Sequence, residues 1–176
     1  MSGFVILDRD GVINEDSPDY IKSPEEWHAV PGSLEAIALL SENNIRVFVA
    51  TNQAGIARGK LTQASLDAIH EKMFREVEAA GGRIVDLRYC PHHPNDNCRC
   101  RKPRPGLLED LAEAHDLDLA EGDYVGDSLK DLRAAEAAKC RGVLVLTGNG
   151  AETHQMRPHH EPTFENLLAY ARDRIN

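Results

Sequence analysis

Two carboxylates stand at the point where the first apolar run of the chain ends. Asp8 and Asp10, in the segment Asp8-Arg9-Asp10-Gly11-Val12, directly follow the run Phe4–Leu7. A continuous apolar run indicates a strand buried on both faces, and the ligands of open α/β sheets gather at the carboxyl ends of such strands. Paired carboxylates in that crevice are suited to phosphoryl transfer. Taken alone, the pair is more typical of a polar turn, because aspartate is a common turn residue.

Other polar residues follow apolar runs in the same way. Thr51 comes directly after one such run, Asp127 follows another, and Lys102 precedes the helix expected from Pro105. Because the carboxyl ends of parallel strands meet at one edge of a sheet, we expect these side chains to lie beside Asp8. Each has an ordinary structural explanation when taken alone: Thr51 as a turn hydroxyl, Asp127 as a helix cap and Lys102 as a surface cation. Together they supply the parts of a phosphoryl-transfer site: nucleophile, acid, phosphate-binding groups, a cation, and carboxylates for Mg²⁺.

The elements that must position these residues alternate along the chain. Five strand-like runs are expected, at Phe4–Leu7, Arg46–Ala50, Ile84–Tyr89, Tyr124–Val125 and Val143–Leu146. Amphipathic helical stretches lie between most of them, so an α/β fold with a parallel sheet and crossover helices is predicted.

Two of the helices have recognisable starts, and one later segment has none. Ser33 is the expected N-cap of a helix to Asn43, and Thr62 is the expected N-cap of a longer helix that stops at Gly81-Gly82. The segment 148–162 is rich in turn formers, has no apolar period, and carries His154, His159 and His160. We expect it to be a solvated surface loop.

Composition limits the class of protein. The 176 residues fit one domain, 1–176, and the net charge of −9 argues against binding to nucleic acid or to an anionic membrane surface by bulk attraction. No stretch is long and apolar enough to span a bilayer, and the first residues do not form a signal peptide. We therefore expect a soluble, cytoplasmic protein that works as a monomer on a small anionic substrate.

Four segments in this order resemble the motifs of the haloacid dehalogenase-like phosphatases: Asp8-Arg9-Asp10-Gly11-Val12, Ala50-Thr51-Asn52-Gln53, Arg101-Lys102-Pro103, and Gly126-Asp127-Ser128 with Asp131. The resemblance implies a three-layer, Rossmann-like parallel sheet without a large cap domain. It further implies that Asp8 attacks phosphorus to form an aspartyl phosphate, and that Asp10 is the general acid and base.

The resemblance also assigns the metal and phosphate ligands. It implies that Mg²⁺ is held by Asp8, the main-chain carbonyl of Asp10 and Asp127, with Asp131 in support. Thr51 and Lys102 match the residues that hold the phosphoryl oxygens. A carboxylate that approaches a phosphate dianion needs such positive charge to offset the repulsion.

A dense group of metal ligands lies between positions 90 and 100. Cys90, Cys98 and Cys100 are three of the four cysteines of the chain, and His92 and His93 stand between them. Three thiolates and one imidazole form a closed tetrahedral zinc set, which is typical of a structural site. Spacing leaves the choice between the two histidines open. The resemblance implies His92, and because the loop runs into Arg101 and Lys102, we expect zinc to position these two cations.

Two branches of the family carry such a loop, and they differ in substrate. One acts on D-glycero-D-manno-heptose 1,7-bisphosphate, in nucleotide-heptose and lipopolysaccharide precursor synthesis, and the other acts on histidinol phosphate. The segment Gly55–Lys60 resembles the heptose enzymes, and its Arg58 and Lys60 suit a substrate with a second phosphate. The shortness of the zinc loop favours the histidinol-phosphate branch instead.

We favour the heptose bisphosphate, with its 7-phosphate as the group removed. The expected substrate contacts are Asp16, Asp19, Thr51, Asn52, Gln53, Arg58, Lys60, Arg101 and Lys102. Histidinol phosphate is the alternative substrate. A zinc-stapled binding module that has lost its chemistry is a further alternative, although Asp8, Asp10, Lys102 and Asp127 are all present.

Overall fold

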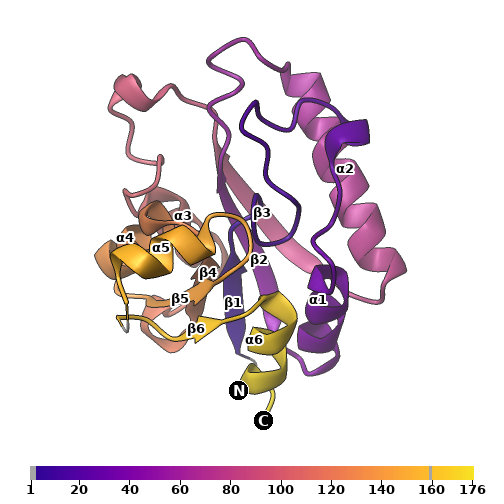
Figure 1. Ribbon diagram of the computed structural model, residues 1–176, viewed down its shortest axis with the longest axis vertical. Coiled ribbons are helices and arrows are strands. Elements are labelled where there is room, and N and C mark those ends of the chain that lie inside the picture. The colour runs from indigo at the N-terminus through magenta and orange to yellow at the C-terminus, as the bar shows by residue number, and fades with distance from the viewer. Residues whose placement is uncertain (1–2, 159) are drawn as a thin grey trace.

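The structure is a computed structural model that describes residues 3–158 and 160–176. Six parallel strands form one sheet in the order β3-β2-β1-β4-β5-β6 (Figure 1). The strands are β1 (Phe4–Leu7), β2 (Arg46–Asn52), β3 (Ile84–Cys90), β4 (Asp123–Gly126), β5 (Arg141–Val145) and β6 (Thr163–Phe164). The helices are α1 (Ser33–Glu42), α2 (Gln63–Ala79), α3 (Gly106–His115), α4 (Leu129–Ala137), α5 (Gly150–Met156) and α6 (Leu167–Arg174).

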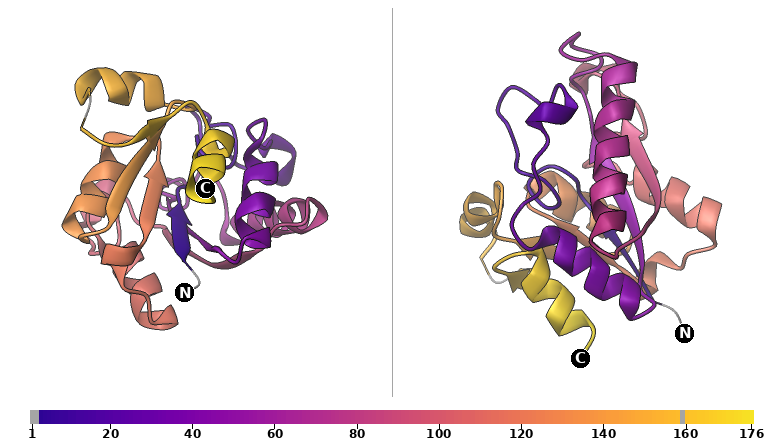
Figure 2. Two further views of the ribbon diagram at one scale, coloured as in Figure 1. Left: turned by 90° about the horizontal axis from the view of Figure 1, so that it is seen from below. Right: turned by 90° about the vertical axis from the view of Figure 1, so that its right-hand side faces the viewer.

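Helices cover both faces of the sheet and make three layers, as Figures 1 and 2 show. Alternate residues of each strand point to opposite faces. Val5 and Leu7 of β1 therefore pack in one core with α1, α2 and α6, whereas Phe4 and Ile6 pack in a second core with α3 and α4. The predicted α/β fold with a parallel sheet is confirmed.

The strand order places a topological switch point at the carboxyl end of β1. From β1 the chain builds outward through β2 and β3, and it later returns to the other side of β1 with β4. Sheets of this kind bind ligands in the crevice at such a point. The connections above it contain no α-helix: residues 8–32 contain the 3₁₀ turn Pro24–Glu26 and two isolated β-bridges at Asn14, and residues 53–62 contain no helix. No large cap domain is inserted at either position.

Two expectations about local structure were wrong. The segment 148–162 is not a simple loop, because α5 lies within it and β6 follows directly. Helix α5 buries only Gly150 and Thr153, so it carries no apolar stripe that a periodicity search could find. Of its expected histidines, His154 lies in α5 and His160 follows it, and His159 lies outside the described residues.

The cap of α1 also differs from the expectation. Gly32, with φ 87°, occupies the cap position, and Ser33 is the first helical residue. The hydroxyl of Ser33 donates instead to the main-chain oxygen of Val12 at 2.7 Å. The serine thus anchors the loop after β1 to α1. Thr62 does cap α2, since its side chain accepts a hydrogen bond from the main-chain N–H of Ser65.

Within the described residues, the helices are too short or too polar to cross a membrane.

Candidate active site and metal centres

Asp8 leaves the end of β1 and is buried at the floor of the crevice. Its main-chain N–H continues the ladder by donating to the oxygen of Val125 on β4 at 2.9 Å. Its Oδ1 accepts hydrogen bonds from the N–H of Arg9 and from Lys102 Nζ, both at 2.8 Å. Its Oδ2 accepts none from the described residues. One oxygen of Asp8 is therefore fixed, and the other is available to a metal ion or a substrate.

Asp10 is held by donors on both of its oxygens. Oδ1 accepts from Arg9 Nη2 at 2.8 Å and from Asn14 Nδ2 at 2.9 Å, and Oδ2 accepts from Gln53 Nε2 at 3.1 Å. Burial opposes ionisation, but the charge of Arg9 and these hydrogen bonds outweigh it and hold the pKa of Asp10 below its usual value. Gln53 also donates to Thr51 Oγ1 at 3.0 Å, so it links the loops after β1 and β2.

Lys102 reaches the floor from the loop before α3 and is almost fully buried. Its Nζ lies 2.8 Å from Asp8 Oδ1, 2.7 Å from Asp131 Oδ1 and 2.7 Å from the hydroxyl of Tyr124. Burial alone would lower the pKa of this amine, but the two carboxylates outweigh it and raise the pKa. Lys102 therefore carries a positive charge between two acids.

The main chain at Lys102 is clamped by a residue of β2. Asn52 Oδ1 accepts the N–H of Lys102 at 3.0 Å, and Asn52 Nδ2 donates to the oxygen of Lys102 at 3.1 Å. Asn52 also lines the cavity. Its two hydrogen bonds show that its amide is directed at Lys102.

Asp127 and Asp131 follow β4 and play different structural parts. Ser128 caps α4, and Asp131 Oδ2 accepts the main-chain N–H of both Asp127 and Ser128 at 3.1 Å. Since Asp131 Oδ1 lies against Lys102 and Tyr124, both of its oxygens are occupied. Asp127 instead uses only Oδ2, which accepts the N–H of Asn149 at 2.8 Å. Its Oδ1 accepts no hydrogen bond from the described residues.

These acids form a group that fits a hard cation. Asp8, Asp127 and Asp131 offer oxygens that lie within 4.8 Å of one another. Burial raises the pKa of Asp8 well above its ordinary value, and burial together with the charge of Asp131 raises the pKa of Asp127 to about 7. A divalent ion would offset this repulsion, and Mg²⁺ prefers carboxylate oxygens. Asp8 and Asp127 each have an oxygen free to bind such an ion directly, whereas both oxygens of Asp131 are occupied by hydrogen bonds.

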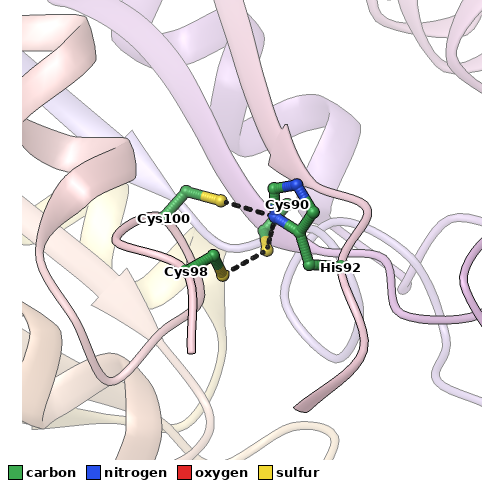
Figure 3. A group of neighbouring side chains, drawn as sticks. All are labelled: Cys90, His92, Cys98 and Cys100. Atoms are coloured by element: carbon green, nitrogen blue, oxygen red, sulfur yellow. Dashed lines mark hydrogen bonds between the residues drawn. The ribbon is translucent and has the colours of Figure 1, made fainter. Parts of the chain in front are cut away.

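The second metal-ligating group lies at the end of β3 (Figure 3). His92 Nδ1 is 3.4 Å from Cys90 Sγ and 3.2 Å from Cys100 Sγ, and the sulfurs of Cys90 and Cys98 are 3.6 Å apart. Tetrahedral zinc with ordinary bond lengths separates its ligands by roughly 3.5 Å. His93 is turned away, because its Nδ1 accepts the N–H of Asn95 in the following turn. The four predicted residues thus converge.

Three cations stand at the rim of the cavity above Asp8. Arg58, Arg101 and Lys130 line this cavity of about 260 Å³, and none of them makes an ion pair within the described residues. A side-chain nitrogen of Arg101, Nη1, is buried without a hydrogen-bond partner. The rim therefore presents unneutralised positive charge.

The expected substrate contacts are only partly brought together. Asp16 lines the cavity, as do Thr51 and Asn52. Lys60 and Asp19 do not line it, and they pair with each other at 3.3 Å on the surface. Gln53 is buried beneath the cavity.

Several lining residues were not anticipated, namely Tyr20, Ala54, Pro94, Lys130 and Asn149. Lys130 lies in the first turn of α4, two residues beyond the cap Ser128, and that position could have identified it.

Comparison with known proteins agrees with this geometry. Residues 99–168 match a family model described as HAD-hydrolase-like. D-glycero-β-D-manno-heptose-1,7-bisphosphate 7-phosphatase of Bordetella bronchiseptica is 53% identical over 149 residues, which cover 85% of this chain and 83% of that protein. The chain belongs to this family of heptose-bisphosphate phosphatases. The enzyme of the same name from Escherichia coli is 37% identical over 152 residues, covering 82% of this chain and 79% of that protein.

Solved structures of the heptose-bisphosphate phosphatases have the same fold. The D,D-heptose 1,7-bisphosphate phosphatase of B. bronchiseptica, complexed with magnesium and phosphate, superposes with a TM-score of 0.95 at 48% identity and covers 98% of both chains. The corresponding enzyme from Burkholderia thailandensis has a TM-score of 0.78 at 42% identity and covers 99% of both chains. The resemblance to haloacid dehalogenase-like phosphatases, read from the four motifs, is confirmed.

Proposed function

We propose that the protein is a magnesium-dependent phosphatase that removes the 7-phosphate of D-glycero-D-manno-heptose 1,7-bisphosphate. The observation that carries this proposal is the layout of one cavity. Its floor holds Asp8, Lys102 and Asp127, and its rim holds Arg58, Arg101 and Lys130, for which the described part of the chain supplies no ion pair. The floor suits transfer of one phosphoryl group, and the rim suits a second phosphate on the same substrate.

The floor residues divide the reaction into two steps. In the first, the carboxylate of Asp8 attacks phosphorus, a bond from Asp8 to phosphorus forms, and the bond from phosphorus to the sugar oxygen breaks. Asp10 gives its proton to the departing sugar oxygen. In the second, Asp10 takes a proton from a water molecule that attacks phosphorus, so that Asp8 and inorganic phosphate are released.

The proton on Asp10 has to come with the substrate, because the free site favours the carboxylate. Arg9 and the amides of Asn14 and Gln53 hold the pKa of Asp10 low. A phosphate dianion beside Asp10 disfavours a second negative charge, and its arrival therefore raises this pKa. We infer that Asp10 acquires its proton as the substrate binds.

Positive charge on the floor offsets the repulsion between Asp8 and the phosphate. Lys102 supplies one charge, held 2.8 Å from Asp8 Oδ1. Magnesium, when bound by Asp8, Asp127 and the main-chain oxygen of Asp10, supplies charge stabilisation for the transferring phosphoryl group. Thr51, which Gln53 orients, lines the cavity and offers its hydroxyl to a phosphoryl oxygen.

We assign zinc to Cys90, His92, Cys98 and Cys100 in a structural role. Four protein ligands close a tetrahedral site and leave no position for a catalytic water. Only Arg101 separates the last ligand, Cys100, from Lys102, so zinc holds the end of the loop that delivers this cation. We further propose that the enzyme acts as a monomer in the cytoplasm, where thiols stay reduced. Gel filtration tests the oligomeric state.

The substrate is tested by comparing kcat/KM on three esters with magnesium present: heptose 1,7-bisphosphate, heptose 7-phosphate and histidinol phosphate. The bisphosphate is expected to be the best substrate, because only it reaches the rim with a second phosphate. Replacing Arg58 with Gln should lower kcat/KM on the bisphosphate and leave that on heptose 7-phosphate nearly unchanged. A preference for histidinol phosphate would overturn the substrate assignment.

The covalent step is tested separately with Asp8→Asn. The variant should lose turnover on every ester while it retains one zinc per chain. Substantial activity in this variant would exclude an aspartyl-phosphate route.

A further inference from the structure

Asp127 receives contacts from a segment that begins twenty residues beyond it. This segment, residues 147–153, follows β5 and includes the first turn of α5, and most of it lies in the stretch 148–162 that was expected to be a solvated loop. The hydroxyl of Thr147 donates to the main-chain oxygen of Gly11 at 2.7 Å, and the hydroxyl of Thr153 donates to the main-chain oxygen of Asp127 at 2.8 Å. The segment therefore braces the loops after β1 and β4 against each other.

One oxygen of Asp127 is enclosed by this segment. A Cβ atom added to Gly11 would lie 2.1 Å from Asp127 Oδ2, and one added to Gly148 would lie 2.2 Å from it. Because glycine has no Cβ, the main chain at both positions can approach the carboxylate closely, and both glycines also have a positive φ, 84° and 56°, that other residues rarely adopt. Oδ2 is thus the oxygen that faces the protein.

Asn149 supplies the donors to that oxygen. Its main-chain N–H lies 2.8 Å from Asp127 Oδ2, and its side-chain Nδ2 lies 3.2 Å from the same atom. The same Nδ2 is 3.3 Å from Oδ2 of Asp16, in the loop after β1 that lines the cavity. The side chain makes no capping hydrogen bond to α5, so its amide is directed at these two acids.

We propose that Asn149 is a positioning residue that fixes the rotamer of Asp127 and ties the Asp16 loop to it. With Oδ2 held by two donors, Oδ1 is turned toward the cavity as a metal ligand. The side-chain amide of Asn149 donates to both Asp127 and Asp16. The position of the loop that carries Asp16 and contacts the substrate therefore depends on whether Asp127 binds a metal ion. This inference rests on the proposed function, because it takes Asp127 to bind magnesium.

The first test measures binding of magnesium alone, without substrate, from the rise of the unfolding temperature during a Mg²⁺ titration. Asn149→Ala keeps the main-chain donor and loses the side-chain donor, so we expect the Mg²⁺ dissociation constant to rise about 3- to 10-fold, less than the roughly 10- to 100-fold typical when a metal ligand loses its partner entirely. Asn149 is exposed, and Asn149→Ser, with a side chain favoured at helix starts, serves as a second variant with the same expectation. Glu152→Ala, on the exposed face of α5, is the matched control and should bind Mg²⁺ as the parent does.

The second test uses turnover to detect the link to Asp16. With saturating Mg²⁺, kcat of Asn149→Ala should stay within about twofold of the parent value, whereas KM should rise. Asp16→Ala should raise KM less in the Asn149→Ala background than in the parent, because the shared hydrogen bond is already lost. Additive effects on KM would contradict the link.

The reference variant Asp127→Asn separates the two levels of the argument. It should abolish the Mg²⁺-dependent rise in unfolding temperature. If it does, and both Asn149 variants bind Mg²⁺ within twofold of the parent, the positioning role is wrong and the proposed function stands. If Asp127→Asn still binds Mg²⁺ normally, the proposed metal site is wrong and the role of Asn149 falls with it.

Discussion

Replacing Lys102 with Met should destabilise the fold as well as stop catalysis. The amine lies 2.8 Å from Asp8 Oδ1 and 2.7 Å from Asp131 Oδ1, and its side chain is 3% exposed. Methionine has a similar length and no charge, so the variant leaves buried acids without their cation. Removing one partner of a buried pair typically costs about 3–5 kcal/mol, because the remaining charge stays desolvated.

Most of this cost should arise at Asp131. Burial would raise the pKa of Asp131, but the charge of Lys102 outweighs it and keeps the pKa below its ordinary value. Asp8 contributes less, because burial already raises its pKa and it can take up a proton. A loss of about 3–5 kcal/mol lowers the unfolding temperature of a chain of this size by roughly 6–20 °C.

The sign of the pH dependence follows from the same shift. A carboxyl whose folded pKa is depressed stabilises the fold above its unfolded pKa, and this contribution is lost as pH falls through the folded value. In Lys102→Met the pKa of Asp131 rises instead, so the folded variant takes up a proton on acidification. The stability gap between parent and variant should therefore be widest near pH 7 and narrower near pH 5.

The assay is urea unfolding at both pH values, with zinc retained and no magnesium added. Lys130→Met is the matched control, since Lys130 lines the same cavity but is exposed and makes no ion pair. It should change stability by less than about 0.5 kcal/mol. Equal urea midpoints for the two variants, or a stability gap for Lys102→Met that does not narrow at pH 5, would show that Lys102 does not stabilise Asp131 in this way.

Three other predictions follow from neighbouring contacts. Burial and the charge of Arg9 lower the pKa of His70 to about 3, so the fold loses up to about 5 kcal/mol of stability as pH falls from 6.5 toward 3. The variant His70→Gln should lose less stability over this pH range in acid-unfolding measurements, and an unchanged pH dependence below 6.5 would contradict the prediction. Asn52→Ala removes two hydrogen bonds to the main chain of Lys102, which are worth about 2 kcal/mol in all. The variant should have a kcat about 30-fold lower with its zinc content unchanged, and a wild-type kcat would show that these hydrogen bonds are not needed. Removing zinc with a chelator should lower activity even with magnesium in excess, and full turnover in a verified zinc-free sample would separate the two metals.

The site residues that the sequence predicts share one property: each follows a strongly apolar strand or lies in the cysteine-rich loop 90–100 or next to it. Asp8 and Asp127 stand directly after buried strands, and parallel pairing then requires them to be neighbours at one edge of the sheet. The Cys-x-His and Cys-x-Cys spacing similarly needs no knowledge of the rest of the fold. These features depend on burial and local spacing, which a single sequence displays directly.

Side-chain direction could not be found in that way. Asn52 and Gln53 were expected to contact substrate, but the amide of Asn52 clamps Lys102 and that of Gln53 bridges Asp10 and Thr51. Lys60 was expected near the second phosphate, and it pairs with Asp19 on the surface. The choice between such partners depends on a few ångströms of loop geometry, and residue type alone does not determine it.

The least predictable part of the site is the one that arrives last along the chain. Asn149 precedes a short helix that buries only Gly150 and Thr153, so neither apolar periodicity nor a strand end marks it. Its place beside Asp127 follows from the switch point, because β5 continues outward from β4 and its following loop must return over the carboxyl edge. The loop after β5 thus starts at the same edge as Asp8 and Asp127, and it contacts Asp127 and the main chain of Gly11. Polar residues that follow the strands near a switch point are therefore candidates for the site, as are those after the first strand, even where the following helix has no apolar face.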